Sequence, residues 1–482
     1  MNLLNRKTKI STLHPEKIIQ FGEGNFLRAF ADWIVYRMNQ SLNFNAGVVV
    51  VQPIDRGMSD VLNEQNGLYT LILKGLQNSR PVRTLECIDV INRCLDPYRD
   101  YQGYLETAEN PQLRYLISNT TEAGIVFKDT DRFDHSPAST YPGKLTRWLF
   151  HRFEYFRGDP GKGMILFPCE LIDRNGDHLR DAVLRYAVLW NLGESFTEWV
   201  EEVNIFCNTL VDRIVPGFPK NEIQPITEEL GYEDKLVVEG EIFHLWVIEG
   251  PALVRREFPA DKAGLNVLFT DSMKPYRDRK VTLLNGPHTV LSPVSWLYGL
   301  DTVREACEDA KIGAYVRKVM YEELLPTLDL PEHELKQFAD EVLDRFKNPY
   351  VRHQVTDIML NAFPKYKTRD LPSVLKYLNI KDTLPKGLVF GLAAILFYYS
   401  GTPRVSDKKF PVIRDDEKIV SMMSDLWKEG DVSCLVHTVL SSETLWERDL
   451  TEVPGMEALL SEYLNEMIHS GVPSALDRIL SE

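Results

Sequence analysis

Short apolar segments in the first half of the chain alternate with longer amphipathic ones. The strand candidates KIIQF, GVVVVQPI, LRYLIS and GMILFPCEL have the continuous hydrophobicity of strands buried on both faces. Helical spacing is found between them, for example in NFLRAFADWIVYRMNQ and GDHLRDAVLRYAVLW. Strands that alternate with helices in this way form a mostly parallel sheet with helices packed on it. The first half is therefore predicted to be an α/β domain.

The second half has a different pattern. From about residue 301 onward, strand signals nearly vanish and apolar residues recur every three or four positions. The segments FHLWVIEG and LNVLFTD are interpreted as the last strands, and SMKPYRDRK as the start of the helical part. Because 482 residues exceed what one hydrophobic core supports, we divide the chain into an α/β domain, 1–270, and a mainly α-helical domain, 271–482.

Charge and cysteine usage exclude several classes of protein. The formal net charge is −15, whereas binding to a phosphate backbone needs a concentrated basic face, so no nucleic-acid partner is expected. The six cysteines contain no C-x-x-C pair, which argues against a zinc knuckle and a disulfide framework and predicts buried, reduced thiols.

Neither export nor membrane insertion is expected. The N-terminal segment MNLLNRKTKI carries charges where a signal peptide would have its apolar core. The longest apolar run, from Gly387 to Tyr399, is too short for a bilayer and suits a buried helix better. We therefore expect a cytoplasmic protein without a membrane partner.

Two glycines stand between the first predicted strand and the first predicted helix, in IIQFGEGNFLRAF. Gly22 would allow a tight turn, and Gly24 would let the backbone approach a pyrophosphate that the following helix N-terminus attracts. Leu27 occupies the third small position of the dinucleotide-binding fingerprint, so a plain strand-to-helix turn is an equal alternative. The Arg28 guanidinium is placed to reach the pyrophosphate or to tie the turn to a nearby carboxylate, and the sequence leaves both roles open.

Two further loops belong to the predicted cofactor site. Asp55 follows the second strand, where a carboxylate binds ribose hydroxyls and favours NAD, although its neighbour Arg56 suits a 2′-phosphate. The segment SNTTEAG follows another strand and places Thr120, Thr121 and Glu122 on the nicotinamide side. Solvated polar turns are the alternative for both loops.

A second constellation, RKVTLLNGPHTVL, lies near the predicted domain boundary. On an α-helix, Lys280, Asn285 and His288 would stand at roughly 0°, 140° and 80°, on one face. Lysine can donate the proton and the other two can polarise the oxygen when a ketone is reduced, without a metal. Pro287 predicts a kink or a short break. The alternative is that Lys280 solvates a helix end and His288 is a capping or core residue.

Together the two motifs resemble the mannitol dehydrogenase family of polyol-specific long-chain dehydrogenases. The similarity runs along nearly the whole chain and includes NGLYTL, SNTTEAG, CNTLVDRIVPG and RFKNPYVRHQ. It implies a Rossmann-type NAD-binding domain, a helical C-terminal domain, catalysis without zinc, Lys280 as general acid/base, and Asn285 and His288 as ligands of the substrate oxygen. It also implies that Asp212 contacts the substrate. The family's cofactor fingerprint corresponds here to Ile18, Ile19, Gln20, Phe21, Gly22, Glu23, Gly24, Asn25, Phe26, Leu27, Arg28 and Ala29.

One departure from the family pattern bears on the substrate. Polyol dehydrogenases carry C-D-N-x-x-x-N-G, whereas this chain has Cys169-Glu170-Leu171 and keeps Asn175, a substrate-binding candidate. The segments PCELIDRNGD, LVDRIV, LNGPHT and PKYKTR resemble members that interconvert D-tagaturonate and D-altronate. Fructuronate reduction, neutral polyol oxidation and a non-catalytic NAD sensor are the alternatives.

A hexuronate substrate requires a cation for its carboxylate. The stretch VRHQVTDIMLNAFPKYKTR supplies five candidates, of which Arg352 and Lys365 are the first choices, with a solvated basic stripe as the alternative. The five are Arg352, His353, Lys365, Lys367 and Arg369. The expected partner is thus a small hexuronate or aldonate, handled by a monomer or a weak homo-oligomer.

Overall fold

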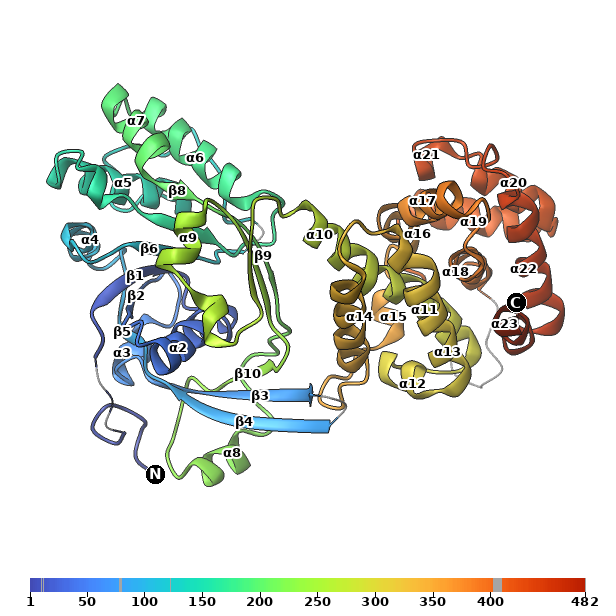
Figure 1. Ribbon diagram of the computed structural model, residues 1–482, viewed down its shortest axis with the longest axis horizontal. Helices are drawn as coiled ribbons and strands as arrows, with labels where there is room; N and C mark the ends of the chain where they lie inside the picture. The colour runs from blue at the N-terminus through green and yellow to red at the C-terminus, as the bar shows by residue number, and fades with distance from the viewer. Residues whose placement is uncertain (10, 12, 78–79, 122, 402–409, 482) are drawn as a thin grey trace. The chain divides into compact units, whose positions relative to one another are not determined.

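The structure is a computed structural model that describes residues 1–482 except 10, 12, 78–79, 122, 402–409 and 482. The chain divides into two compact units, one of residues 1–75 and 82–273, the other of residues 76–81 and 274–482. Figure 1 shows strands concentrated in the first unit and helices in the second.

The first unit is built on a six-stranded sheet with the order β5-β2-β1-β6-β7-β8. All its strand pairs are parallel, which confirms the predicted α/β class. Strand order reverses between β1 and β6, and ligands bind at such a point in open parallel sheets. The strands are β1 (Glu16–Phe21), β2 (Gly47–Val51), β5 (Ile91–Leu95), β6 (Tyr115–Ser118), β7 (Ile165–Pro168) and β8 (Ile205–Phe206).

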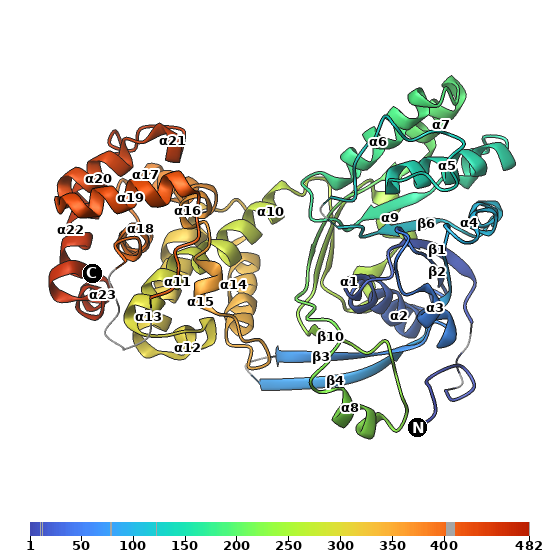
Figure 2. The same cartoon turned by 180° about the vertical axis from the view of Figure 1, so that it is seen from behind.

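Both faces of this sheet are covered, which explains its uninterrupted apolar strands. One core cluster joins inward residues of β1 and β2 to α2, and another joins β6 and β7 to helices on the opposite face. Figures 1 and 2 show the two helix layers on either side of the strands. The helices are α1 (Asn25–Ala29), α2 (Ala31–Leu42), α3 (Ser59–Glu64), α4 (Tyr101–Glu106), α5 (Tyr141–Tyr155), α6 (Asn175–Leu189), α7 (Glu194–Val203), α8 (Ile223–Leu230) and α9 (Ala252–Glu257).

Two three-stranded sheets complete the first unit, with orders β10-β3-β4 and β12-β11-β9. The predicted strands FHLWVIEG and LNVLFTD are present as β11 and β12. The β3 and β4 strands were not predicted. β4 is largely solvent-exposed and lacks a continuous apolar run, whereas β3 is mostly buried and pairs with the distant β10. The strands are β3 (Tyr69–Gln77), β4 (Arg80–Ile88), β9 (Asn208–Asp212), β10 (Val238–Glu241), β11 (Leu245–Glu249) and β12 (Val267–Thr270).

Helices make up the second unit, and its described residues beyond 273 form no β-strand. The apolar run that was predicted to be a buried helix forms α18, whose residues from Gly387 to Leu396 are all buried. The helices are α10 (Lys274–Lys280), η4 (Val281–Asn285), α11 (Gly286–Tyr298), α12 (Val303–Glu308), α13 (Ala310–Lys318), η5 (Val319–Leu324), η6 (Leu325–Thr327), α14 (Glu332–Phe346), α15 (Val355–Ile358), α16 (Ala362–Arg369), α17 (Leu371–Lys381), α18 (Lys386–Tyr398), α19 (Glu417–Glu429), α20 (Val432–Leu440), α21 (Glu443–Trp446), α22 (Met456–Ser470) and α23 (Val472–Ser481).

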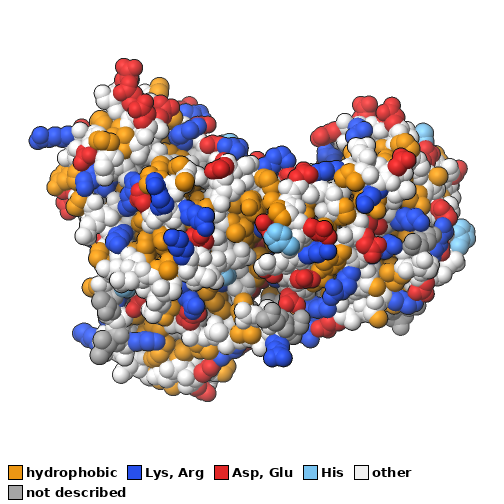
Figure 3. Space-filling view, in the orientation of Figure 1, with side chains coloured by type: hydrophobic (Ala, Val, Ile, Leu, Met, Phe, Trp, Pro, Cys, Tyr) orange, Lys and Arg blue, Asp and Glu red, His pale blue; other side chains and the backbone are white. Residues whose placement is uncertain are grey.

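All six cysteines are free, but Cys434 is exposed and Cys87 partly so, which makes the prediction of uniformly buried thiols wrong for these two. On the face drawn in Figure 3, basic side chains are interspersed with acidic ones over both units. Among the described residues, no helix is both long and apolar enough to cross a bilayer.

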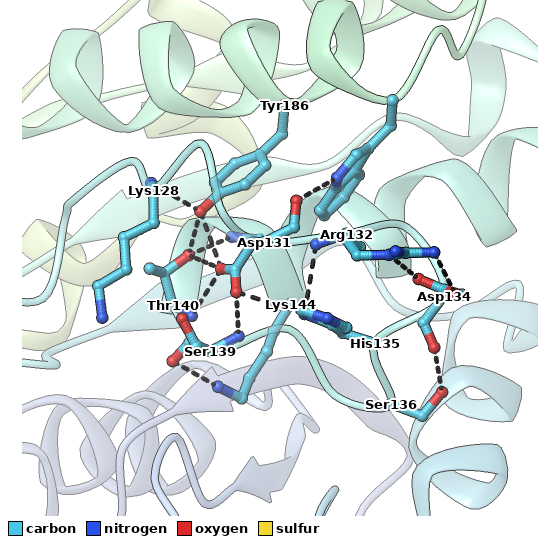
Figure 4. A network of polar contacts seen from close by, with 12 residues as sticks. Lys128, Asp131, Arg132, Asp134, His135, Ser136, Ser139, Thr140, Lys144 and Tyr186 are labelled. Atoms are coloured by element: carbon cyan, nitrogen blue, oxygen red, sulfur yellow. Dashed lines mark hydrogen bonds and ion pairs between the residues drawn. The ribbon is translucent and has the colours of Figure 1, made fainter.

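The loop between β6 and α5 is organised by the buried carboxylate of Asp131 (Figure 4). It accepts hydrogen bonds from the backbone N–H of Ser139 at 2.9 Å, from that of Thr140 at 3.2 Å, and from the Tyr186 hydroxyl at 3.0 Å. Burial alone would raise the pKa of Asp131, but these hydrogen bonds outweigh it and hold the pKa below its usual value. The loop therefore depends on an ionised Asp131.

Replacing Asp131 by Asn should destabilise the first unit by about 2–4 kcal/mol, because an amide NH₂ would face donors that now point at an oxygen. Since the pKa is lowered in the folded state, the difference should be full at neutral pH and shrink in acid, as Asp131 itself becomes protonated. Thermal unfolding at pH 7 and at about pH 2 measures it. Asp134→Asn, an exposed position of the same loop, is the matched control and should change stability by less than about 0.5 kcal/mol. Equal effects of the two substitutions would contradict the assignment.

Candidate functional site

The turn after β1 has the two properties that the glycines predicted. Gly22 has φ of +119°, and a Cβ there would lie 2.8 Å from the Asn119 carbonyl oxygen, so only glycine fits. Gly24 is exposed and its missing Cβ faces open space. The backbone beside Gly24 and Asn25, which is also exposed, is therefore accessible to a ligand at the point where strand order reverses.

The helix after this turn is shorter than predicted. Instead of one continuous helix, α1 ends at Ala29 and α2 begins at Ala31, because Phe30 leaves the helical conformation with φ −129° and ψ −79°. Leu27, which replaces the third small residue of the usual fingerprint, is buried and lies next to Gly22. The turn thus packs against the Leu27 side chain as well as against the Asn119 backbone.

Arg28 points into the protein interior. Its guanidinium, only 2% exposed, donates to the carbonyl oxygens of Glu23 and Leu236 and to the Asn25 side-chain oxygen. The Tyr69 hydroxyl in turn donates to the Arg28 carbonyl at 2.6 Å. Arg28 therefore ties the turn as one sequence alternative suggested, but its partners are carbonyl and amide oxygens and not a carboxylate.

Most other residues of the cofactor fingerprint are buried and pack in the protein interior. The side chains of Ile18, Ile19, Phe21, Leu27 and Ala29 belong to the hydrophobic core, and Phe26 stacks on Phe30 with ring centroids 5.0 Å apart. Glu23 is buried, and burial raises its pKa. The side-chain amide of Gln20 donates to the Gly22 carbonyl at 3.0 Å and to Asp32 at 3.4 Å.

The other predicted cofactor residues follow strands of the same parallel sheet, so their loops share the carboxyl edge with the glycine turn. Asp55 is exposed after β2. Thr120 follows β6 and donates from its N–H and its hydroxyl to Glu170, both at 3.0 Å. Thr121 is exposed with φ of +78°, uncommon for a β-branched residue. Glu122 lies outside the described residues.

Glu170 is a site-organising residue that the sequence did not single out. Its buried carboxylate also accepts from the Ser118 hydroxyl at 3.0 Å, so it joins the ends of β6 and β7. Burial raises the pKa of Glu170, while these donors oppose that rise. The next residue, Leu171, is 62% exposed at the position where the family pattern has a substrate-binding asparagine.

The two remaining substrate-binding candidates of the first unit are Asn175 and Asp212. Asn175 is fully buried; its NH₂ donates to the carbonyls of Pro168, Glu170 and Thr209, and its oxygen accepts from the Thr209 N–H at 2.8 Å. These contacts use the NH₂ donors of Asn175 and one lone pair of its oxygen, and they hold the buried side chain between the ends of β7 and β9. Asp212 ends β9 and is 9% exposed.

A π-helix separates Lys280 from Asn285, where an α-helix was expected. Lys280 ends α10, the π-helical segment η4 runs from Val281 to Asn285, and α11 starts at Gly286. In a π-helix the hydrogen bonds join residues five apart, so Lys280 and Asn285 stand about one turn apart. Pro287 is accommodated in the first turn of α11, where a missing N–H costs least. The predicted break is thus a local change of helix type.

His288 is enclosed by other rings and by cations. Its ring centroid lies 4.1 Å from that of Phe346 and 5.1 Å from that of His353. Burial, followed by the positive charges of His353, Arg345 and Arg369, lowers the pKa of His288 well below its usual value. The Leu284 carbonyl accepts a hydrogen bond from the ring, and Nε2 is buried without a partner among the described residues. The imidazole is therefore neutral, with Nδ1 as donor and Nε2 as a lone-pair acceptor.

Asn285 lines a cavity of about 700 Å³ that is built from second-unit residues alone. Arg369, from the end of α16, lines the same cavity. Neither Lys280 nor His288 is among its lining residues. Of the predicted trio, Asn285 is thus the member that lines this cavity.

The two predicted carboxylate anchors lie outside this cavity. Arg352 is exposed. Lys365 is half-buried and donates from Nζ to the Ile358 carbonyl at 2.6 Å; burial, assisted by Arg369, lowers its pKa to about 8. Among the described residues, no group of three or more His, Cys, Asp or Glu side chains is arranged to hold a metal ion.

The arrangement defines a class of protein: a Rossmann-type domain with a glycine turn at its carboxyl edge, followed by a helical domain, as in two-domain dehydrogenases. The model of the mannitol dehydrogenase Rossmann domain matches residues 16–262, and that of the mannitol dehydrogenase C-terminal domain matches residues 272–468. The chain belongs to the mannitol dehydrogenase family and is an oxidoreductase, which confirms the resemblance seen in the sequence.

Curated relatives extend over the whole chain. An altronate oxidoreductase of Phocaeicola vulgatus is 53% identical over 480 residues, covering 100% of both chains. One of Bacillus subtilis is 46% identical over 471 residues, covering 97% of this chain and 96% of the relative.

Solved structures agree on the fold. A D-sorbitol dehydrogenase in substrate-free form has a TM-score of 0.80 at 22% identity, covering 98% of this chain and 100% of the other. The Pseudomonas fluorescens mannitol 2-dehydrogenase, in a ternary complex with NAD and D-mannitol, has a TM-score of 0.64 at 22% identity and full coverage of both chains.

The buried pair of Gln20 and Asp32 beneath the turn generates a prediction. Burial raises the pKa of Asp32 to about 7, so the folded state binds a proton that the unfolded state releases near pH 4. Stability that Asp32 provides in acid is therefore lost as pH rises towards and through 7. Asp32→Asn keeps an oxygen for Gln20 and should stabilise the protein at pH 8 by up to about 4 kcal/mol, with little effect at pH 4.

Thermal unfolding of wild type and Asp32→Asn across pH 4–8 measures this difference. Asp60→Asn, whose side chain is 74% exposed, is the control and should show no such pH trend. A difference that is constant with pH would contradict the raised pKa.

Proposed function

We propose that the protein is an NAD-dependent oxidoreductase that interconverts D-tagaturonate and D-altronate in hexuronate catabolism, without a metal. The observation that carries this proposal is the full-length similarity, at 46–53% identity, to relatives named altronate oxidoreductase. The exposed Leu171 supports it, because a leucine cannot replace the amide that family members use for a neutral polyol.

The first unit fits a dinucleotide. Gly22 with its positive φ, the open backbone at Gly24 and the exposed Asn25 make a turn that suits a pyrophosphate, and we assign the exposed Asp55 after β2 to the ribose hydroxyls, which favours NAD. When bound, NADH supplies the hydride that adds to the ketone carbon. Thr120 and Thr121 are proposed to lie on the nicotinamide side. The fixed contacts of Thr120 with Glu170 support this by holding that loop in place.

The second unit is proposed to manage the proton. Lys280 donates it from Nζ to the ketone oxygen as the alkoxide develops and takes it back in the reverse direction. The Asn285 NH₂ donates a hydrogen bond to the same oxygen and stabilises its charge. His288, whose buried Nε2 has no hydrogen-bond partner among the described residues, is proposed to accept from a substrate hydroxyl, in place of the donor role that the sequence suggested. Asp212 is proposed as a further hydroxyl acceptor.

We further propose a cytoplasmic enzyme that works on this small-molecule substrate as a monomer or weak homo-oligomer. Fructuronate reduction and polyol 2-dehydrogenation are the competing activities within the family.

Substrate identity is tested by following NADH and NADPH absorbance with D-tagaturonate, D-fructuronate and D-fructose. The expected order of kcat/KM is tagaturonate first, with NADH above NADPH, because the site lacks the polyol asparagine and has a carboxylate at Asp55. A clear preference for fructose would overturn the hexuronate assignment, and a preference for fructuronate would reassign the substrate within the class.

Replacing Lys280 by Ala should lower kcat by about 10²–10⁴-fold while leaving NADH binding unchanged, because the proton donor is lost and the first unit is untouched. Steady-state assays measure kcat, and titration of NADH fluorescence measures NADH binding. The control is Lys336→Ala, an exposed α14 lysine paired with Glu332, which should retain full activity. If Lys280→Ala turned over normally, another group would be the proton donor.

A further inference from the structure

The cavity beside Asn285 carries an excess of positive charge. Of the charged side chains that line it, four are cations and two are anions: Lys274, Arg277, Arg369 and Lys376 against Asp278 and Asp329. An excess of this kind suits an anionic ligand.

Two of the four lining cations form ion pairs with lining carboxylates. Lys274 pairs with Asp278 at 2.5 Å, and Lys376 pairs with Asp329 at 2.8 Å. Both pairs are well exposed, so each is neutral overall and weakly held. The lining also contains two arginines, of which Arg369 is the less exposed.

Arg369 is held in place while most of its donors remain available. Among the described residues its guanidinium makes one side-chain hydrogen bond, from Nη1 to the Thr289 hydroxyl at 3.2 Å. This contact ties Arg369 to α11, the helix that begins directly after Asn285. The remaining N–H groups keep the fork geometry that binds a carboxylate through two parallel hydrogen bonds.

The neighbouring Asp370 does not neutralise this charge. Its carboxyl group is fully buried, and neither oxygen has a partner among the described residues. One of these oxygens instead lies against Gly286, where a Cβ would approach it to 2.9 Å. Burial raises the pKa of Asp370 well above its usual value, which disfavours its charged form. Since neither carboxyl oxygen of Asp370 has a hydrogen-bond partner among the described residues, Asp370 makes no such contact with the Arg369 guanidinium.

Arg369 also connects the two other polar members of the site. It lines the cavity with Asn285, and its charge is among those that lower the pKa of His288. A ligand whose carbonyl oxygen bonds to Asn285 can therefore place a carboxylate on Arg369 within the same second-unit cavity. Arg352 and Lys365, the anchors chosen from the sequence, do not line it.

We propose that Arg369 binds the substrate carboxylate and thereby selects a ketohexuronate over a neutral ketose. This assignment rests on the proposed function and specifies which side chain provides its selectivity. It predicts that the benefit of Arg369 is confined to substrates that carry the anionic group.

The test compares Arg369→Gln and Arg369→Lys with wild type, using D-tagaturonate and the neutral ketose D-tagatose, with NADH. For tagaturonate, Arg369→Gln should raise KM so that kcat/KM falls about 10- to 100-fold, since charge-assisted hydrogen bonds are lost. Arg369→Lys should recover part of this loss, because it keeps the charge without the fork. For tagatose, kcat/KM should stay equal or rise in both variants.

The matched control is Arg304→Gln, an exposed α12 arginine paired with Glu308 that does not line the cavity; its kinetics should equal those of wild type. Thermal unfolding and NADH affinity are measured for every variant. An equal loss on both ketoses, or a lowered unfolding temperature in Arg369→Lys as well, would show a structural role and overturn the proposal. Wild type that fails to reduce any hexuronate would instead refute the proposed function, a result visible without any variant.

Discussion

Two buried guanidinium groups hold the glycine turn of this protein in place. A five-residue helix such as α1 is far below the length at which helices are stable alone, so its position must come from tertiary contacts. Arg28 bonds the start of the turn to the Leu236 carbonyl. Arg213, stacked 4.2 Å from the Trp33 ring, bonds the Ala29 carbonyl at the end of α1 and the carbonyls of Ile242 and Phe243. The accessible backbone at Gly24 therefore depends on chain segments some two hundred residues away.

Elements whose hydrophobicity is uniform could be predicted from the sequence. The apolar runs became the parallel strands, and α18 is buried along its length as its composition required. Elements defined by distant partners could not. The break at Phe30 follows from carbonyls captured across the unit, and β3 pairs with β10, whose residues come more than 150 positions later. The local structural propensity of a segment gives no information on such distant partners.

The candidate site was likewise predictable in its motifs and less so in its individual residues. The glycine pair and the loops after β2 and β6 do share the carboxyl edge of the sheet, because parallel strands impose it. The choice among cations was not determined by sequence, since Arg352, Lys365 and Arg369 differ in burial and partners rather than in chemistry. The sequence likewise did not reveal that Asn175 is buried and hydrogen-bonded to Thr209, thirty-four positions later.

The π-helical segment η4 gives the spacing of the K-x₄-N motif a physical meaning. In K-x₄-N, the four residues between the lysine and the asparagine complete one π-helical turn. With three intervening residues, one α-helical turn would bring the same two side chains into line. A chain that lost a residue here would keep its lysine above its asparagine but draw α11 closer to α10 and rotate it. The extra residue thus sets the distance and the rotation of α11 relative to α10. In a comparison of related sequences, the length of this interval would report the helix type.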